Sequence, residues 1–213
     1  MITKHQYLDK YPISKKSEKL IVGTIHPHDH ESFIIPFFYG NVTSIWTILS
    51  EAYPEDLKTP LTLNGILDFL KIKKISVSDT IRKCERKNPT ALDKDLIPLE
   101  LNRQIKDDIK NSKISEILFT SGFGKNNAFR LFYVDILGLK ITKDIREKRE
   151  VILDNEIFGR TIKLTVLYSP SGTSNVGLSK SKEYLDKKKK YEKSPRPVYD
   201  FKVDYYREKF ESK

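Results

Sequence analysis

Short apolar runs that end at glycine or polar residues alternate along this chain with longer segments of helical periodicity. Residues 19–24 read Lys-Leu-Ile-Val-Gly-Thr, and residues 114–120 read Ile-Ser-Glu-Ile-Leu-Phe-Thr. Runs of this kind are typical of strands that are buried on both faces of a parallel sheet. β-branched residues and alternation predict two further strands at residues 75–79 and 161–167.

Between the predicted strands, apolar residues recur every three or four positions, as they do along one face of a helix. This spacing predicts helices over residues 42–53, with Asn41 as a candidate N-cap, and over residues 60–70, 97–110 and 126–137. Strands that alternate with helices indicate right-handed βαβ units. We therefore expect an α/β fold, a three-layer α/β/α domain around a central parallel sheet of about four strands.

The last part of the chain has a different composition. Residues 180–213 contain 12 Lys and Arg against 7 Asp and Glu, together with many aromatic residues. Aromatic residues at this density favour packing against a core over a free tail. We expect one α/β domain over residues 1–179 and a basic C-terminal segment, 180–213, that packs on it and ends in a helix over about 200–210. Four lysines of this segment are consecutive: Lys187, Lys188, Lys189 and Lys190.

The charge balance favours a polyanionic partner. Lys and Arg number 39 against 29 Asp and Glu, so the formal net charge is +10, and such an excess favours nucleic acid through Coulomb attraction and counterion release. The single cysteine, Cys84, excludes an intrachain disulfide and an iron–sulfur cluster held by four thiolates of this chain. No apolar run has the length of a signal peptide or a membrane span, so we expect an intracellular protein that is neither secreted nor membrane-bound.

Three polar loops follow predicted strands and are expected to meet at the carboxyl edge of the sheet, where open parallel sheets bind their ligands. They are residues 23–30, 121–125 and 169–175. The first loop holds His26, His28 and His30, at a spacing that also suits a metal ion. No second cluster of ligands is visible in the sequence. We therefore expect no metal site, and a histidine here fits a base or a water-positioning group better.

Five segments carry a more specific signal: residues 20–27 (Leu-Ile-Val-Gly-Thr-Ile-His-Pro), 37–46 (Phe-Phe-Tyr-Gly followed by Trp46), 75–86 (with Asp-x-x-x-x-Cys-x-Arg at its end), 117–122 (Ile-Leu-Phe-Thr-Ser-Gly) and 169–174 (Ser-Pro-Ser-Gly-Thr-Ser). In order and spacing they resemble motifs of the uracil-DNA glycosylase superfamily. The aromatic stretch and the segment that contains Cys84 are most similar to the mismatch-specific and hypoxanthine-DNA glycosylase branch.

The resemblance implies a monofunctional DNA glycosylase, monomeric and without a cofactor. Such an enzyme flips a damaged, mismatched or modified base out of double- or single-stranded DNA and hydrolyses its N-glycosidic bond. Uracil is the first expectation for the base, and hypoxanthine, mismatched thymine and a hypermodified base stay open. Two other functions also stay open: a non-catalytic DNA-binding relative of the same fold, and an enzyme that acts on a phosphorylated small molecule.

The resemblance also assigns residues. In the Gly-x-Asn-Pro form of the first motif, the Asn position falls on His26, and the Asn that this branch places three residues before Trp46 is replaced by Thr43. We therefore expect His26 to position or polarise the attacking water, with Asn41 as the alternative. The base-binding residues are expected to be Gly23, Phe37, Phe38, Tyr39 and Ser121. The DNA-binding residues are expected to be Ser169, Ser171, Gly172 and Thr173, in a loop that enters the minor groove, and the lysines Lys187, Lys188, Lys189 and Lys190.

Overall fold

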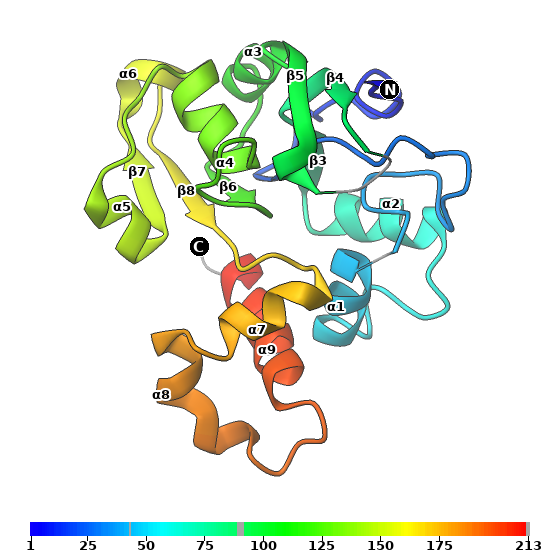
Figure 1. Ribbon diagram of the computed structural model, residues 1–213, viewed down its shortest axis with the longest axis vertical. Helices are drawn as coiled ribbons and strands as arrows, with labels where there is room; N and C mark the ends of the chain where they lie inside the picture. The colour runs from blue at the N-terminus through cyan, green and yellow to red at the C-terminus, as the bar shows by residue number, and fades with distance from the viewer. Residues whose placement is uncertain (43, 89–91, 212–213) are drawn as a thin grey trace.

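The computed structural model describes residues 1–42, 44–88 and 92–211. Its central sheet has five strands, in the spatial order β3 (Ile75–Asp79), β2 (Lys19–Gly23), β6 (Glu116–Phe119), β8 (Ile162–Val166) and β7 (Glu150–Leu153) (Figure 1). The first four strands are parallel to their neighbours, and β7 pairs with β8 in the antiparallel direction. The predicted α/β fold with four parallel strands is confirmed, and β7 adds an antiparallel edge strand that the sequence did not predict.

The two faces of the sheet are buried in separate cores because successive side chains of a strand point to opposite faces. Ile21 of β2 lies in one core, and its neighbours Leu20 and Val22 lie in the other. The first face is covered by α1 (Ser44–Ala52), α2 (Leu63–Ile72) and α9 (Pro197–Glu211). The second face is covered by α3 (Gln104–Lys110), α4 (Ala128–Arg130) and the π-helical turn η2 (Leu131–Ile136). The sheet is therefore the middle of three layers.

A second sheet was missed by the sequence analysis. It is antiparallel, with the order β1 (Ile2–Lys4), β4 (Ile81–Arg86) and β5 (Leu96–Leu101). The helix predicted over 97–110 is therefore wrong in its first part, and only α3 is helical. A spacing of four residues links Ile97 to Leu101 and Ile105, as in a helix, yet Ile97 lies exposed on β5, where backbone pairing with β4 determines the structure.

The other predicted helices are present with shifted ends. α2 begins three residues later than predicted because Thr62 is its N-cap; the Thr62 hydroxyl accepts a hydrogen bond from the backbone N–H of Gly65 at 3.1 Å. The last helix begins at Pro197, where a fixed φ suits the first turn. The described residues also form short elements: η1 (Asp93–Asp95), α5 (Lys143–Lys148), α6 (Asn155–Phe158), η3 (Gly172–Ser174) and α7 (Asn175–Leu178).

The N-terminal segment, residues 5–18, covers the open edge of β3. Near the carboxyl end of β3, His5 bonds to Asp79, and at the other end the backbone N–H of Glu18 donates to Lys74 O. Ser17 bonds to Ser76 between these two points, with 2.7 Å between their hydroxyl oxygens. This segment occupies an edge at which another chain would otherwise pair, and it brings an N-terminal histidine to the carboxyl edge of the sheet.

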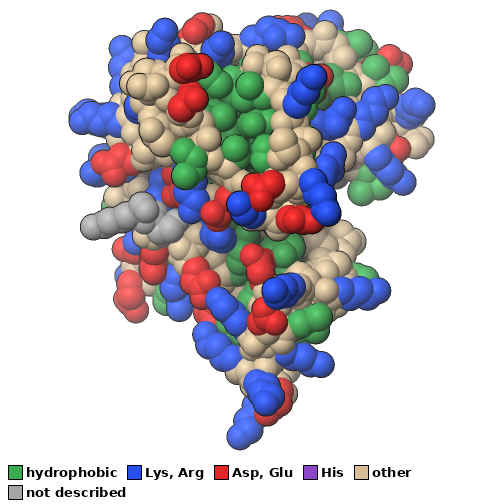
Figure 2. Space-filling view, turned by 90° about the vertical axis from the view of Figure 1, so that its left-hand side faces the viewer, with side chains coloured by type: hydrophobic (Ala, Val, Ile, Leu, Met, Phe, Trp, Pro, Cys, Tyr) green, Lys and Arg blue, Asp and Glu red, His purple; other side chains and the backbone are tan. Residues whose placement is uncertain are grey.

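The C-terminal segment contributes to the main core. α9 packs on α1, and α8 (Lys182–Tyr191) packs on α9 at the lower end of the molecule (Figure 1). Several basic side chains lie at this narrow end (Figure 2). Tyr184, Phe201 and Tyr206 lie in the same core as Ile21. The division into residues 1–179 and 180–213 stays a prediction. Within the described residues, we find no helix with the length and apolar character that a membrane crossing requires.

Phe201→Ala tests how far the fold depends on the C-terminal segment. Phe201 is 2% exposed, and truncation of a buried phenylalanine lowers the free energy of unfolding by about 3–5 kcal/mol. The matched control is Leu185→Ala on α8, where the side chain is 52% exposed and a change within about 0.5 kcal/mol is expected. Urea unfolding of both variants measures the difference. Equal, small effects would show that the segment is dispensable for the core.

Candidate functional site

The strand order sets a topological switch point at the carboxyl edge of the central sheet. From β2 the chain continues to β3 on one side, whereas β6 and β8 lie on the other side, so the topological switch point lies between β2 and β6. Ligands of open α/β sheets bind outside the carboxyl ends of the strands at such a point. Thr24 follows β2 here, and Thr120 and Ser121 follow β6.

Gly23, the last residue of β2, lies beneath two oxygen atoms. A Cβ atom at this position would collide with the hydroxyl of Tyr39 and with Oδ1 of Asp79. The Tyr39 hydroxyl bonds to Thr120 Oγ1 at 3.0 Å, and burial raises the pKa of Tyr39 well above its ordinary value, so its hydroxyl keeps its proton. Tyr39 also has a left-handed φ of 57°, a backbone strain that is often found at functional sites.

A second carboxyl group, Asp93, lies beside this position. The hydroxyl of Thr24 donates to Asp93 Oδ1 at 2.7 Å. Burial raises the pKa of the Asp93 carboxyl, while hydrogen bonds from Thr24 and Ser121 partly oppose the shift. The side chain of Asn126 fixes the segment, since its Nδ2 donates to Asp93 O at 2.9 Å and to Leu96 O at 2.7 Å. Asp93 was not predicted as a site residue because no predicted strand precedes it.

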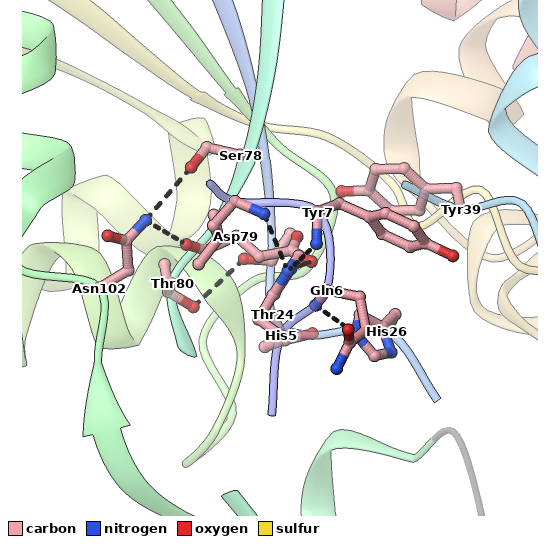
Figure 3. Close-up of polar contacts among 12 residues, drawn as sticks. His5, Gln6, Tyr7, Thr24, His26, Tyr39, Ser78, Asp79, Thr80 and Asn102 are labelled. Atoms are coloured by element: carbon pink, nitrogen blue, oxygen red, sulfur yellow. Dashed lines mark hydrogen bonds and ion pairs between the residues drawn. The ribbon is translucent and has the colours of Figure 1, made fainter. Parts of the chain in front are cut away.

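Asp79, at the end of β3, is held by the N-terminal segment (Figure 3). Its Oδ2 lies 2.8 Å from Nε2 of His5. Nδ1 of His5 accepts hydrogen bonds from the backbone N–H groups of Tyr7 at 3.0 Å and Leu8 at 3.3 Å. Nδ1 therefore carries no proton, and Nε2–H donates to Asp79. No sequence pattern indicates this pair, because 74 positions separate its two members.

His26 is buried, with both ring nitrogens bonded to the backbone. Nε2 accepts from the N–H of Gln6 at 3.0 Å, and Nδ1 donates to Pro27 O at 2.6 Å. Burial lowers the pKa of His26 to about 4, so the imidazole is neutral near pH 7. These bonds tie the N-terminal segment to the first loop. The predicted catalytic role of His26 stays a prediction, and it requires one of the two bonds to open.

The predicted base-binding residues fall into two groups. Gly23, Tyr39 and Ser121 lie at the switch point, whereas Phe37 and Phe38 lie in the core with exposed fractions of 2% and 1%. The carbonyl oxygen of Phe38 accepts from Nε1 of Trp46 at 2.8 Å, which fixes the turn that presents Tyr39. The predicted alternative, Asn41, is partly exposed just before α1, and Thr43 lies outside the described residues.

The remaining histidines of the first loop lie near the surface. Nδ1 of His28 bonds to Thr3 Oγ1 at 3.0 Å, and Nδ1 of His30 lies 3.3 Å from the carbonyl oxygen of His28. Within the described part of the chain, no group of three or more His, Cys, Asp or Glu side chains is arranged to hold a metal ion.

The predicted DNA-binding residues lie in two places. The loop 169–175 follows β8, and Ser171, Gly172 and Thr173 are exposed on it. The four lysines lie on α8, apart from the sheet (Figure 1). Lys187 pairs with Glu208 at 2.9 Å and Lys190 with Asp204 at 2.6 Å, both on α9. Lys188 and Lys189 are exposed, and neither forms an ion pair with another described residue.

Comparison with known proteins supports the fold. The solution NMR structure of a protein from Methanosarcina acetivorans described as a "putative uracil DNA glycosylase" matches with a TM-score of 0.53 and 17% sequence identity, over 100% of both chains. At this identity the likeness concerns the fold alone. No protein-family model matches the sequence, and no curated protein matches it.

The buried His26 predicts a pH dependence of stability. The folded protein binds a proton at His26 only near pH 4, whereas the unfolded chain binds one near pH 6.5. The unfolded state therefore binds more protons in this window, and stability that is present at pH 7 is lost as the pH falls from about 6.5 to 4. The shift corresponds to about 3 kcal/mol. Urea unfolding at pH 7 and at pH 4 should show this loss of stability in the wild type and in His28→Gln, the control at an exposed histidine. The loss should be smaller in His26→Gln. Equal losses in all three proteins would contradict the prediction.

Proposed function

We propose that the protein is a DNA glycosylase that binds an extruded base at the switch point between β2 and β6. The observation that carries this proposal is the convergence there of the Tyr39 hydroxyl, the Asp79 carboxyl and the Asp93–Thr24 pair around a glycine. Two observations support the choice of DNA as substrate: the similarity of the fold to that of the protein described as a "putative uracil DNA glycosylase", and the net charge of +10.

Hydrolysis of an N-glycosidic bond requires a water molecule aimed at the sugar C1′ atom and a group that stabilises the departing base. We assign the first role to Asp93, which is partly exposed and oriented by Thr24. Burial raises the pKa of Asp93, which makes its carboxylate a stronger base toward the water proton. The water oxygen bonds to C1′, its proton passes to Asp93, and the C1′–N bond breaks. Tyr39, which keeps its proton, donates a hydrogen bond to the departing base.

We assign DNA binding to the loop 169–175 and, on α8, to Lys188 and Lys189. The loop follows a strand whose carboxyl end lies at the same edge as the switch point, and its exposed Gly172 leaves room for close approach to a groove. Uracil, hypoxanthine, thymine in a mismatch and a modified base are the candidate targets. A base-release assay on a panel of duplexes, each with one of these bases, identifies the target. The target in turn indicates the branch of the superfamily.

Asp93→Asn tests the catalytic assignment. Loss of a positioned acid–base group lowers the rate by about 10²- to 10⁴-fold, and the amide is nearly isosteric with the carboxyl group. Single-turnover base release from lesion-containing duplexes should fall by this factor, with DNA affinity nearly unchanged. The matched control, Asp95→Asn, makes the same charge change two residues away and should keep the wild-type rate.

His26→Ala and Asn41→Ala belong in the same assay, because they carry the two assignments predicted from the sequence. A full rate in Asp93→Asn together with a collapse in one of these variants would transfer the water-positioning role to that residue. DNA binding without release of any base from the panel would instead identify a non-catalytic relative.

Lys188→Gln/Lys189→Gln tests the role of α8 in DNA affinity. These lysines have no ion-pair partner among the described residues, so each phosphate contact that is lost reduces the slope of log affinity against log salt by about 0.9. The control variant Lys187→Gln/Glu208→Gln removes a complete ion pair without changing the net charge, and its slope should stay at the wild-type value. A slope unchanged in both variants would place α8 outside the DNA contact.

A further inference from the structure

Lys202 on α9 is a completely buried lysine, with an exposed fraction of 0%. Its Nζ donates hydrogen bonds to the carbonyl oxygen of Ser171 at 3.1 Å and to Oγ of Ser174 at 2.9 Å. Both partners are neutral and belong to the loop 169–175. Lysine is almost never buried to this degree unless an opposite charge accompanies it.

Among the described residues of α9 and of the helices that pack against it, no acidic side chain forms an ion pair with Lys202. On α9, Asp200 pairs with Arg196 at 3.1 Å, and Asp204 and Glu208 hold the lysines of α8. On α1, Glu51 pairs with Arg196 at 2.8 Å. α7 has no titratable residue, Glu183 of α8 bonds to Tyr168, and Asp186 of α8 is exposed.

The tyrosines nearby do not supply a negative charge either. Burial raises the pKa values of Tyr168, Tyr205 and Tyr206, so all three are neutral near pH 7. Burial also lowers the pKa of Lys202 to about 8. At neutral pH the core beneath the loop therefore contains a positive charge that only dipoles of the loop compensate.

The loop contacts the ammonium group of Lys202 on one side and is exposed to solvent at residues 171–173. The Ser174 hydroxyl accepts from Lys202 and lies 2.7 Å from the carbonyl oxygens of Ser169 and Ser171, to which it donates. On the outer side, Ser171, Gly172 and Thr173 are exposed, and a Cβ on Gly172 would meet no atom within 4 Å. An anion placed there meets exposed hydroxyl groups, with the ammonium group directly behind the backbone.

We propose that Lys202 makes the loop 169–175 an anion site that receives one DNA phosphate, with Ser171 and Thr173 as the contacting hydroxyls and Lys202 as the charge behind them. Lys202 acts through the loop and is a positioning residue. The choice of DNA as the source of the phosphate rests on the proposed function.

The test uses a stable duplex with a tetrahydrofuran abasic site, so that binding is measured without catalysis. A phosphodiester does not titrate between pH 7 and pH 9, whereas a lysine with a pKa of about 8 loses its proton in this range. If the phosphate binds only the protonated form, wild-type affinity falls about tenfold from pH 7 to pH 9. Lys202→Met should show nearly constant affinity over the same range, and the exposed control Lys180→Met should keep the wild-type dependence.

A second measurement locates the phosphate. Methylphosphonates, which are uncharged, replace the phosphates of the duplex one at a time. At one position of the duplex, the methylphosphonate should weaken DNA binding by the wild-type protein several-fold and leave the affinity of Lys202→Met unchanged. Folding of this variant is checked by thermal unfolding, and we expect an undiminished melting temperature because an apolar side chain of similar length replaces a buried charge.

Equal pH dependence in the wild type and Lys202→Met, or no methylphosphonate position whose effect disappears in the variant, would overturn the inference. The base-release panel keeps this result separate from the proposed function. A protein that shows the Lys202-dependent binding but releases no base supports the anion site and rejects the glycosylase. A protein that releases a base but binds DNA identically with and without Lys202 rejects the anion site alone.

Discussion

At the end of β2, the hydroxyl of Tyr39 and the carboxyl of Asp79 approach the backbone so closely that only glycine fits beneath them. This constraint at Gly23 organises the carboxyl edge of the sheet. Tyr39 adopts a strained backbone conformation, and its hydroxyl bonds to Thr120, which follows the neighbouring strand. Strain of this kind persists only where the surrounding structure over-determines it, and here Trp46 fixes the turn through the carbonyl oxygen of Phe38.

The polar groups near this edge are held by partners that are distant in sequence. His5 orients Asp79, Gln6 bonds to His26, and Asn126 fixes the segment that carries Asp93. Since a polar group taken out of water is costly unless it is hydrogen-bonded, these contacts stabilise the fold and restrict the side chains at the same time. The N-terminal segment therefore has two effects: it covers the edge of β3 and it completes the candidate site.

The C-terminal helices also contribute both to the core and to the candidate DNA-binding surface. Phe201 and Tyr206 of α9 fill the core on one face of the sheet, and Lys202 between them directs a charge at the loop after β8. The helix α9 therefore fills the core and also supports the loop that we propose to bind DNA. On α8, ion pairs to α9 engage Lys187 and Lys190, whereas Lys188 and Lys189 remain available to a polyanion.

The sequence by itself determined the four parallel strands and most of the helices, because buried strands and amphipathic helices leave a periodic pattern that needs no knowledge of the partner. It also located the loops after β2, β6 and β8, since each follows such a strand. The second sheet was not predictable in this way, because Ile97 and Leu99 are exposed on β5 and the strand forms by backbone pairing with β4. Only the tertiary structure brought His5 to Asp79, Asp93 to Thr24 and Lys202 beneath Ser171. Each of these contacts joins segments far apart along the chain, and hydrogen bonds between such segments leave no local pattern from which they can be inferred.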